Sequence, residues 1–425
     1  MRKLSMLLCA LAAAGALWWV FWGTTDAPSD GKRVLRFLDG PDVGGGWKEV
    51  IEAFHKAHPD IRVELEEGPA STNQREDMYT TAFSSGVATY DLAYMDVIWV
   101  PKFASAGWVV PLDERLSEAA RKEFLPGDIA GGTWEGKVCR LPVRSDAGML
   151  YYRKDLLDAA GEKPPETWED LERIAKKLAR PPSMHGFVFQ GKQYEGLICA
   201  FLEHVWGAGG ELIDDEGKVR IDEEPAVAAL TWLVALVREK KIAPEAVTTY
   251  GEEEVRKAFQ EEQALFMRNW PYAWKHLGAE DSKVRGKVGI CPMVHGPGAK
   301  SAATLGGWGF GLARTARDPE AAWTFARFAS GPEGQRILHR RNGAVPSRHA
   351  LYKDPAVLAE SPHLADLYQV VLAARPRPVH PRYSRISDIL QVHVSGALVG
   401  KTAPKEALSN AATEIRAALA EERPK

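Results

Sequence analysis

Short apolar runs alternate with helical patterns in the first hundred residues. Residues 34–38, 61–65 and 90–95 have the length and composition of strands, whereas residues 47–58 are amphipathic and residues 72–85 form a polar helical pattern. The order strand, helix, strand is typical of parallel strands joined by helical crossovers. The pattern therefore predicts an α/β fold with a doubly wound sheet, in which ligands bind beyond the carboxyl ends of the strands.

Helical patterns become more frequent after residue 154. Thr167 and Asp170 have the spacing of a capping box and predict the start of a helix. Residues 264–267 have the pattern of a buried strand, and residues 287–290 that of a strand returning to the first lobe. Further strands are expected at residues 138–142 and 146–152, and further helices at residues 231–240, 252–262, 321–329, 334–339 and 405–421.

The length of 425 residues exceeds what one ordinary core supports. No repeat of fixed period and no low-complexity linker divides the chain, so we expect two lobes joined by several crossings. The first lobe is predicted from residues 32–143 and 288–344, and the second from residues 144–287 and 345–425. Residues 1–31 precede both lobes.

The N-terminal residues differ from the rest of the chain in composition. Arg2 and Lys3 precede residues 4–22, which contain no charged side chain. This composition matches either a signal peptide that is cleaved or a membrane anchor that is retained. Both alternatives predict export, to the periplasm or to the outer face of the cytoplasmic membrane.

The overall composition is that of a folded protein with a small or neutral partner. Hydrophobic residues make up 45% of the chain and charged residues 26%, and the net charge of -3 supplies no basic surface for nucleic acid. The sequence has no glycine-rich nucleotide-binding motif and no Cys-x-x-Cys pair, so we expect neither a cofactor nor a metal. Cys199 lies in an apolar run typical of a core. Cys139 and Cys291 lie in strand-like segments, which leaves one disulfide open as an alternative.

Two aromatic motifs lie where ordinary core packing is interrupted. Trp270 and Tyr272 flank Pro271, which cannot continue a helix, and Trp308 lies among glycines that leave bare backbone beside its ring. Rings held in this way can cover the C–H face of a sugar while neighbouring carboxylates, amides and guanidinium groups bind its hydroxyls. The motifs therefore favour a carbohydrate ligand over a purely structural role.

Six runs of sequence, taken together and in order, carry a resemblance to a known family. They are residues 107–113, 150–157, 189–197, 267–274, 304–309 and 375–379. The sequence resembles the extracellular solute-binding proteins of ABC sugar importers, most closely the trehalose/maltose-binding group. The resemblance implies a two-lobed periplasmic-binding-protein fold of type II. Each lobe would be a doubly wound sheet flanked by helices, and the lobes would close on a sugar by hinge motion.

The resemblance also implies roles for individual residues. Carboxylates would accept sugar hydroxyls, arginines would donate to them, aromatic rings would stack on the sugar, and one glycine would bring its backbone close to a hydroxyl. These residues are Asp96, Asp146, Arg75, Arg377, Trp270, Tyr272, Trp308 and Gly307. Two positions depart from the family pattern. Glycines follow Asp42 where relatives often carry an acidic or amide side chain, which leaves open whether Asp42 replaces that contact, and Arg144 lies where an aromatic residue is common.

The implied function is capture of a disaccharide or short oligosaccharide, without catalysis, by a monomer that delivers it to an ABC permease and its ATPase. Two alternatives stay open from the residues themselves. A glycan hydrolase would use Asp96 and Asp146 as its pair of carboxylates, although no hydrolase motif accompanies them. A membrane-anchored surface lectin would bind the same ligands and need no transporter.

Overall fold

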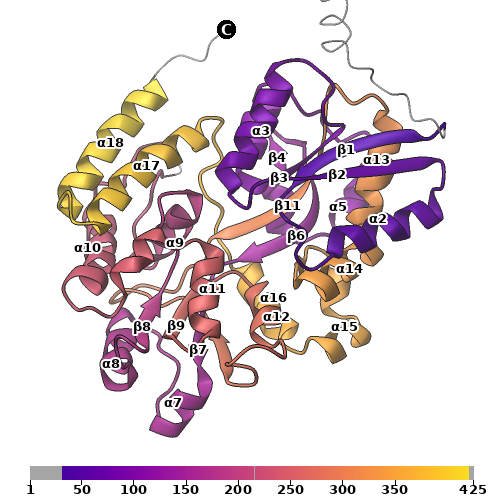
Figure 1. Cartoon of the computed structure of the whole chain (residues 1–425). Helices are drawn as coiled ribbons and strands as arrows, with labels where there is room; N and C mark the ends of the chain where they lie inside the picture. The colour runs from indigo at the N-terminus through magenta and orange to yellow at the C-terminus, as the bar shows by residue number, and fades with distance from the viewer. Residues whose placement is uncertain (1–30, 215, 421–425) are drawn as a thin grey trace, which may run out of the picture.

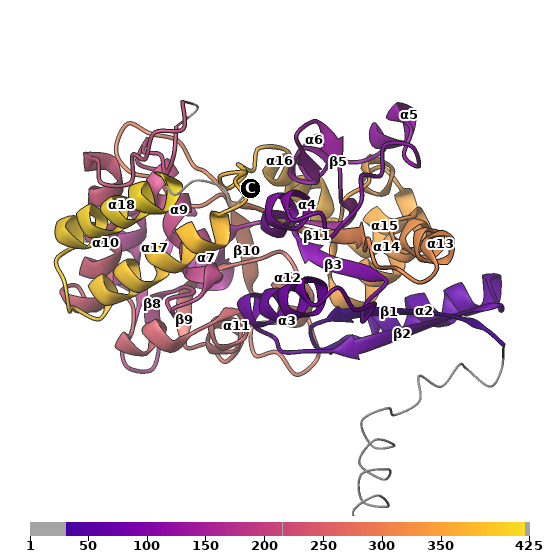
Figure 2. The same cartoon turned by 90° about the horizontal axis from the view of Figure 1, so that it is seen from above.

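The structure, a computed structural model, describes residues 31–214 and 216–420. These residues form two lobes that lie side by side, each built from segments distant in sequence (Figures 1 and 2). The predicted leader at residues 1–31 lies, apart from its last residue, outside the described residues. Within the described part of the chain, no helix has both the length and the apolar character needed to cross a bilayer.

The first lobe contains the early strands and a later set of helices. Its elements are β1 (Arg33–Asp39), α2 (Gly46–Ala57), β2 (Ile61–Glu67), α3 (Thr72–Ser84), β3 (Leu92–Asp96), η1 (Val97–Trp99), α4 (Val100–Ser105), α5 (Glu118–Arg121), α6 (Pro126–Gly131), β4 (Thr133–Trp134), β5 (Lys137–Val138), β6 (Leu141–Ala147), β11 (Leu305–Leu312), α13 (Pro319–Ala329), α14 (Pro332–Asn342), β12 (Val345–Pro346), η3 (His349–Tyr352), α15 (Pro355–Glu360) and α16 (Leu364–Leu372). Strands β1 and β2 are parallel, as predicted. A four-stranded sheet has the order β12-β6-β11-β3, with β11 antiparallel to both of its neighbours.

The second lobe surrounds a four-stranded sheet of order β10-β7-β9-β8. Its elements are β7 (Met149–Arg153), α7 (Lys154–Ala160), α8 (Trp168–Leu178), β8 (His185–Val188), α9 (Glu195–Trp206), α10 (Glu224–Arg238), η2 (Glu245–Thr249), α11 (Glu252–Gln260), β9 (Ala264–Asn269), α12 (Ala273–Leu277), β10 (Val288–Cys291), α17 (Tyr383–Leu398) and α18 (Pro404–Ala420). Helix α8 begins with the predicted capping box, in which the Asp170 N–H donates to Thr167 Oγ1 at 3.1 Å.

Strand pairing differs from the predicted crossings between the lobes. Strand β6 stays in the first-lobe sheet as far as Ala147, so that crossing lies at Gly148 rather than at 143/144. Strand β10 pairs with β7 and so belongs to the second lobe. The chain therefore crosses back to the first lobe after β10 and before β11, rather than at residue 288 as predicted. Strand β12 pairs with β6, and helices α15 and α16 contact first-lobe elements, which moves the last crossing from 344/345 to the segment before α17. Local apolar patterns identify strands but carry no information on which sheet a strand joins.

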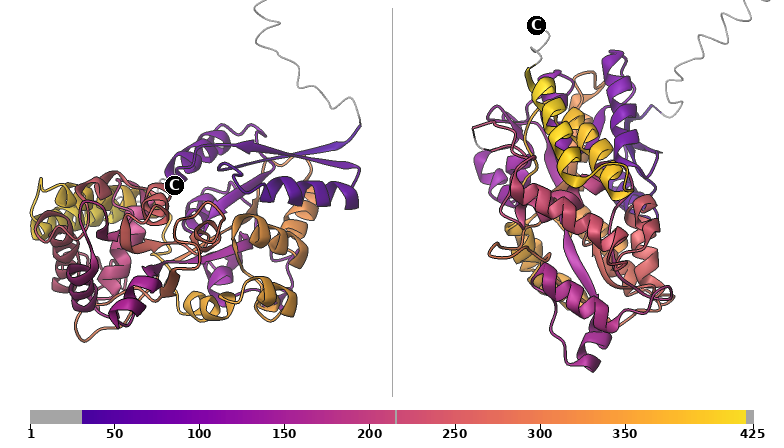
Figure 3. Two further views of the ribbon diagram at one scale, coloured as in Figure 1. Left: turned by 60° about the horizontal axis from the view of Figure 1, so that its bottom comes forward. Right: turned by 90° about the vertical axis from the view of Figure 1, so that its left-hand side faces the viewer.

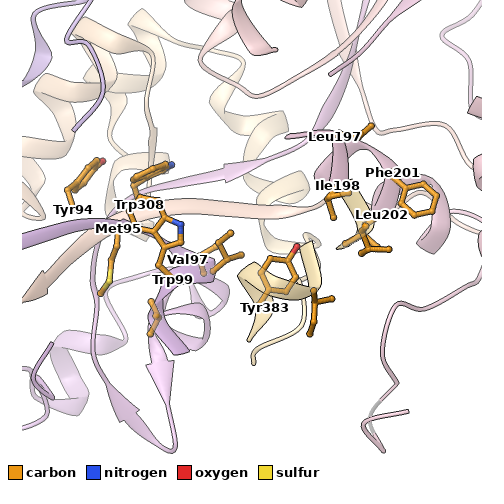
Figure 4. Packing of buried hydrophobic residues seen from close by; sticks show 14 of the residues in the cluster. Tyr94, Met95, Val97, Trp99, Leu197, Ile198, Phe201, Leu202, Trp308 and Tyr383 are labelled. Carbon is orange, nitrogen blue, oxygen red and sulfur yellow. The ribbon is translucent and has the colours of Figure 1, made fainter. Parts of the chain in front are cut away.

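Helix α9 is the centre of the second lobe. All twelve of its residues are buried, because α10 and α17 both lie against it. Figure 4 shows its apolar side chains, of which Ile198 and Leu202 lie on the side toward Tyr383 of α17. Helices α17 and α18 form a hairpin that covers α9 and α10, as the two views in Figure 3 show. The core position expected for Cys199 is confirmed.

The disulfide left open between Cys139 and Cys291 is not formed. Both cysteines are free, as is Cys199. Cys139 lies just before β6 in the first lobe, whereas Cys291 ends β10 in the second lobe. Their strand-like surroundings were predicted, but the sheet to which each belongs was not.

Candidate functional site

A pocket of about 330 Å³ is lined by side chains of both lobes. All eight residues predicted to bind a ligand contribute to its wall: Arg75, Asp96, Asp146, Trp270, Tyr272, Gly307, Trp308 and Arg377. They come from α3, β3, β6, β11, the segment after β9 and the segment before α17. Residues separated by up to about three hundred positions thus share one cavity, although their roles toward a ligand stay a prediction.

The register of the first-lobe sheet brings the central residues together. Trp308 on β11 lies opposite Asp96 on β3 and Arg144 on β6, and Gly306 lies opposite Asp146. Residues directly opposite each other in antiparallel strands share a face of the sheet, and so do residues two apart. One face of this sheet therefore carries two carboxylates, a guanidinium group and an indole ring toward the second lobe.

Asp146 has an acceptor that the protein leaves unused. Its Oδ2 is 3.2 Å from Arg144 Nη1, whereas its Oδ1 is buried and has no hydrogen-bond partner in the protein. Burial raises the pKa of this carboxyl group to about 6, although the Arg144 charge acts in the opposite direction. A buried carboxylate oxygen without a partner is costly, and a ligand hydroxyl placed there would satisfy it.

Asp96 and Arg377 are engaged with each other and with the surrounding protein. Asp96 Oδ1 accepts from the Ile98 N–H at 3.2 Å, which caps η1, and from Arg377 Nη2 at 3.2 Å. Arg377 also donates from Nη1 to Glu195 Oε1 at 2.6 Å and from Nη2 to the Leu305 carbonyl at 3.3 Å. In this arrangement Arg377 joins a first-lobe carboxylate to a second-lobe carboxylate.

Arg75 does not lie on an exposed face of α3 but is buried against Trp308. Its Nη1 donates to the carbonyls of Pro69 at 2.8 Å and Ala70 at 2.9 Å. The guanidinium carbon lies 4.7 Å from the centroid of the Trp308 ring. Arg75 therefore forms part of the pocket wall through a cation–π contact.

Trp308 is largely enclosed by first-lobe side chains. Its ring stacks on Tyr94 with centroids 5.5 Å apart and meets Trp99 edge-on at 5.2 Å, as Figure 4 shows from close by. The residue is 6% exposed. The predicted stacking face is thus mostly covered in this arrangement, partly by Arg75.

Trp270 and Tyr272 form the more accessible aromatic surface, and both are only half-buried. The indole N–H of Trp270 donates to Glu252 Oε1 at 3.4 Å, and the Tyr272 hydroxyl donates to Glu253 Oε1 at 2.6 Å. Both carboxylates belong to the first turn of α11. The Trp270 ring passes over Gly306, where an added Cβ would lie 3.3 Å from the ring.

Several wall residues were not predicted from the sequence. They are Asp39, Tyr94, Glu195, Glu252, Glu253, His276 and Asn342, while Arg144 was noted only as a departure from the family pattern. Asp39 ends the first strand, a position from which it could have been found. Asp42 does not line the pocket, because it accepts from the Lys48 N–H at 3.0 Å and from Asn342 Nδ2 at 3.2 Å. No group of three or more metal-ligating side chains occurs among the described residues.

A ligand-sized pocket between two lobes with charged and aromatic walls defines a two-lobed binding protein. Residues 39–336 match the family described as bacterial extracellular solute-binding protein. The chain belongs to this family, and the predicted family and two-lobed fold are confirmed. The family is one of binding proteins that work outside the cytoplasm.

Three relatives illustrate the range of similarity. A Deinococcus radiodurans protein named probable ABC transporter-binding protein is 35% identical over 356 residues, which cover 81% of this chain and 84% of that protein. The maltose-bound MalE3 of T. maritima has a TM-score of 0.87 and 40% identity, covering 91% of this chain and 99% of its own. A Thermotoga lettingae ABC transporter solute-binding protein, bound to α-D-tagatose, has a TM-score of 0.83 and 25% identity, with coverage of 91% and 100%.

Proposed function

We propose that this protein is the substrate-binding component of an ABC sugar importer. It captures a disaccharide or short oligosaccharide of the trehalose/maltose kind outside the cytoplasmic membrane and delivers it to the permease and its ATPase. The observation that carries the proposal is the pocket that is lined both by Asp146 of the first lobe, whose Oδ1 is unpartnered, and by the half-buried ring of Trp270 of the second lobe. Residues 1–31 direct export in this proposal, whether they are cleaved or retained as an anchor.

The chemistry of the wall supports a polyhydroxylated ligand. Aromatic rings provide an apolar surface at Trp270 and Tyr272, while the carboxylates of Asp146 and Asp96 line the same pocket and provide acceptors. This combination of apolar surface with a few fixed polar groups is typical of small-molecule sites. A volume of about 330 Å³ lies at the lower end of the usual range for such sites, which favours a short saccharide over a long one.

Similarity to known proteins supports the sugar class and leaves its size to experiment. The maltose-bound relative carries a disaccharide, whereas the tagatose-bound relative carries a single sugar ring. The greater identity to the former favours the disaccharide in our proposal.

We propose binding without turnover. Hydrolysis needs one carboxyl group as acid and a second as base or nucleophile. Asp96 Oδ1 is already occupied by a backbone N–H and by Arg377, which favours a positioning role over proton transfer. Asp146 pairs with Arg144 on one oxygen and offers only the other.

The test is a sugar panel with two readouts. Purified protein is titrated calorimetrically with maltose, trehalose, sucrose, tagatose and mannitol, and each mixture is analysed for products. We expect micromolar or tighter binding of one disaccharide and no products. Turnover of any sugar would refute a binding protein, and binding of only single-ring ligands would refute the disaccharide. A strain that lacks this protein should lose uptake of the same sugar, whereas loss of a surface lectin would leave uptake unchanged.

A further inference from the structure

A buried ion pair supports the ring of Trp270. Glu203 on α9 and Arg268 on β9 are both fully buried, and the guanidinium group donates to both carboxylate oxygens, at 2.8 Å from Nε and 2.5 Å from Nη2. The same guanidinium carbon lies 4.1 Å from the centroid of the Trp270 ring. The ring that lines the pocket therefore lies on a charge that is fixed from two directions.

The ion pair also lies where two segments cross between the lobes. The Thr304 N–H, just before β11, donates to Glu203 Oε1 at 3.1 Å, and the Gly148 N–H, between β6 and β7, donates to the Thr304 carbonyl at 3.3 Å. A Cβ added at Gly148 would lie 1.8 Å from Glu203 Oε1 and 2.4 Å from Arg268 Nη2. Only a glycine lets the first crossing approach the ion pair this closely.

A second polar side chain keeps Arg268 in place. Gln190 accepts from Arg268 Nη1 and donates to the Arg268 carbonyl, both at 3.4 Å. Taking two charges fully out of water is expensive, and a well-packed apolar pair of similar volume is often as stable. What an apolar pair does not provide is a flat, planar group held in one orientation beneath an aromatic ring. The geometry therefore indicates a role in positioning rather than in stability alone.

We propose that Glu203 and Arg268 are positioning residues of the ligand site. They hold Trp270 in the orientation that receives a sugar and join that orientation to the two crossing segments, so that placing a sugar on the ring and closing the lobes are coupled. The proposal rests on the proposed function, in which Trp270 contacts a sugar.

The test is a double-mutant cycle with maltose as the probe. A neutral pair, Glu203→Gln with Arg268→Met, is made in the parent and in a Trp270→Ala background, and each variant is titrated by calorimetry. Arg268→Lys is a second variant, which keeps the ion pair but removes the planar group. The matched control is Asp91→Asn with Arg317→Met, because Asp91 is also fully buried and bound by an arginine, but within the first lobe.

We expect the neutral pair to weaken maltose binding by about two- to thirtyfold in the parent, the range that a cation–π contact supplies. In the Trp270→Ala background the same change should alter binding by less than about 1.5-fold, since the ring through which it acts is gone. The control pair should lower the melting temperature without changing affinity. Equal losses in both backgrounds would overturn the proposal. If the neutral pair does not fold, Arg268→Lys replaces it in the cycle, with the same expected pattern.

Two further readouts separate this proposal from the proposed function. If the parent protein binds no sugar of the panel, the proposed function falls. If the parent binds maltose and Trp270→Ala binds it as tightly, or if Trp270→Ala weakens binding but the cycle is additive, only the positioning role falls. Without any sugar, a crystal structure of the neutral pair should show the Trp270 ring displaced from Gly306, and an unmoved ring would overturn the positioning role even if no sugar binds. Small-angle scattering should also show less compaction on adding maltose to the neutral pair than to the control.

Discussion

Asp146→Asn should stabilise the protein without ligand and lower its affinity for the sugar. In the empty pocket the carboxyl group is buried, which raises its pKa from 3.8 to about 6. The raised pKa means that the folded state favours the protonated form. Stability contributed by this group is therefore full below pH 4 and is lost as the pH rises through 6. An asparagine of the same shape carries no charge and escapes this loss.

The magnitude follows from the same numbers. A change from 3.8 to about 6 corresponds to about 3 kcal/mol at pH 8, which is an upper bound for the gain, because Arg144 loses its partner in the variant. Binding should change in the other direction. A hydrogen bond to a charged acceptor contributes about 1.5–3 kcal/mol, so the variant should bind its sugar about ten- to a hundredfold more weakly.

The assay is urea unfolding and calorimetric titration at pH 5, 7 and 8. Sugar affinity of the parent should fall below pH 6 as Asp146 takes up a proton, and affinity of the variant should stay level. Asp113→Asn is the control. Asp113 accepts a hydrogen bond from Arg121 at 2.7 Å, and it does not line the pocket. A variant that is less stable than the parent at pH 8 and binds sugar equally well would refute the reasoning.

Three other changes test separate parts of the structure. Asp96→Ala should weaken sugar binding tenfold or more and lower the free energy of unfolding by about 1 kcal/mol. The variant loses both the Arg377 contact and the cap of η1. Unchanged affinity and an unchanged melting temperature would contradict both roles. Gly148→Ala should lower the free energy of unfolding by about 1–3 kcal/mol, because the added Cβ overlaps Glu203 and Arg268. Thermal melting is compared with that of the control Gly396→Ala, where an added Cβ meets nothing within 4 Å. Equal melting temperatures of the two variants would contradict the close approach at Gly148. Small-angle scattering at saturating sugar should show a smaller radius of gyration than the empty protein, and identical curves would exclude hinge closure.

Local features of the sequence predicted that the rings of Trp270 and Tyr272 would not pack as ordinary core residues. Pro271 ends β9 and turns the chain so that Trp270 and Tyr272 are only half-buried, and this effect needs only neighbouring residues. The capping box at Thr167 was predictable for the same reason. Both follow from interactions within a few positions of the chain.

Contacts between residues far apart in the chain could not be predicted from local sequence patterns. The strand at β10 was recognised, but its partner β7 is more than a hundred residues away, and nothing in a four-residue run encodes that choice. Arg75 lies in a polar helical pattern that by itself does not show whether the side chain is exposed, and its burial results from the contact with Trp308 of a distant strand. In the sequence, Glu252 and Glu253 are typical acidic residues of the first turn of a helix. They line the pocket because the segment after β9 lies beside them, where Trp270 and Tyr272 donate to their carboxylates.

The α17–α18 hairpin has a consequence for the order in which the protein is made. The ribosome synthesises α9 about 180 residues, and α10 about 150 residues, before the hairpin that covers them. Until the hairpin emerges, α9 lacks one of its neighbours, and the second lobe has no complete core. The contacts that finish this lobe join segments that are far apart in the chain, so they form late and slowly. A chain that is proposed to leave the cytoplasm would thereby stay partly unfolded until the hairpin has been synthesised, which is the state that passage through a membrane channel requires.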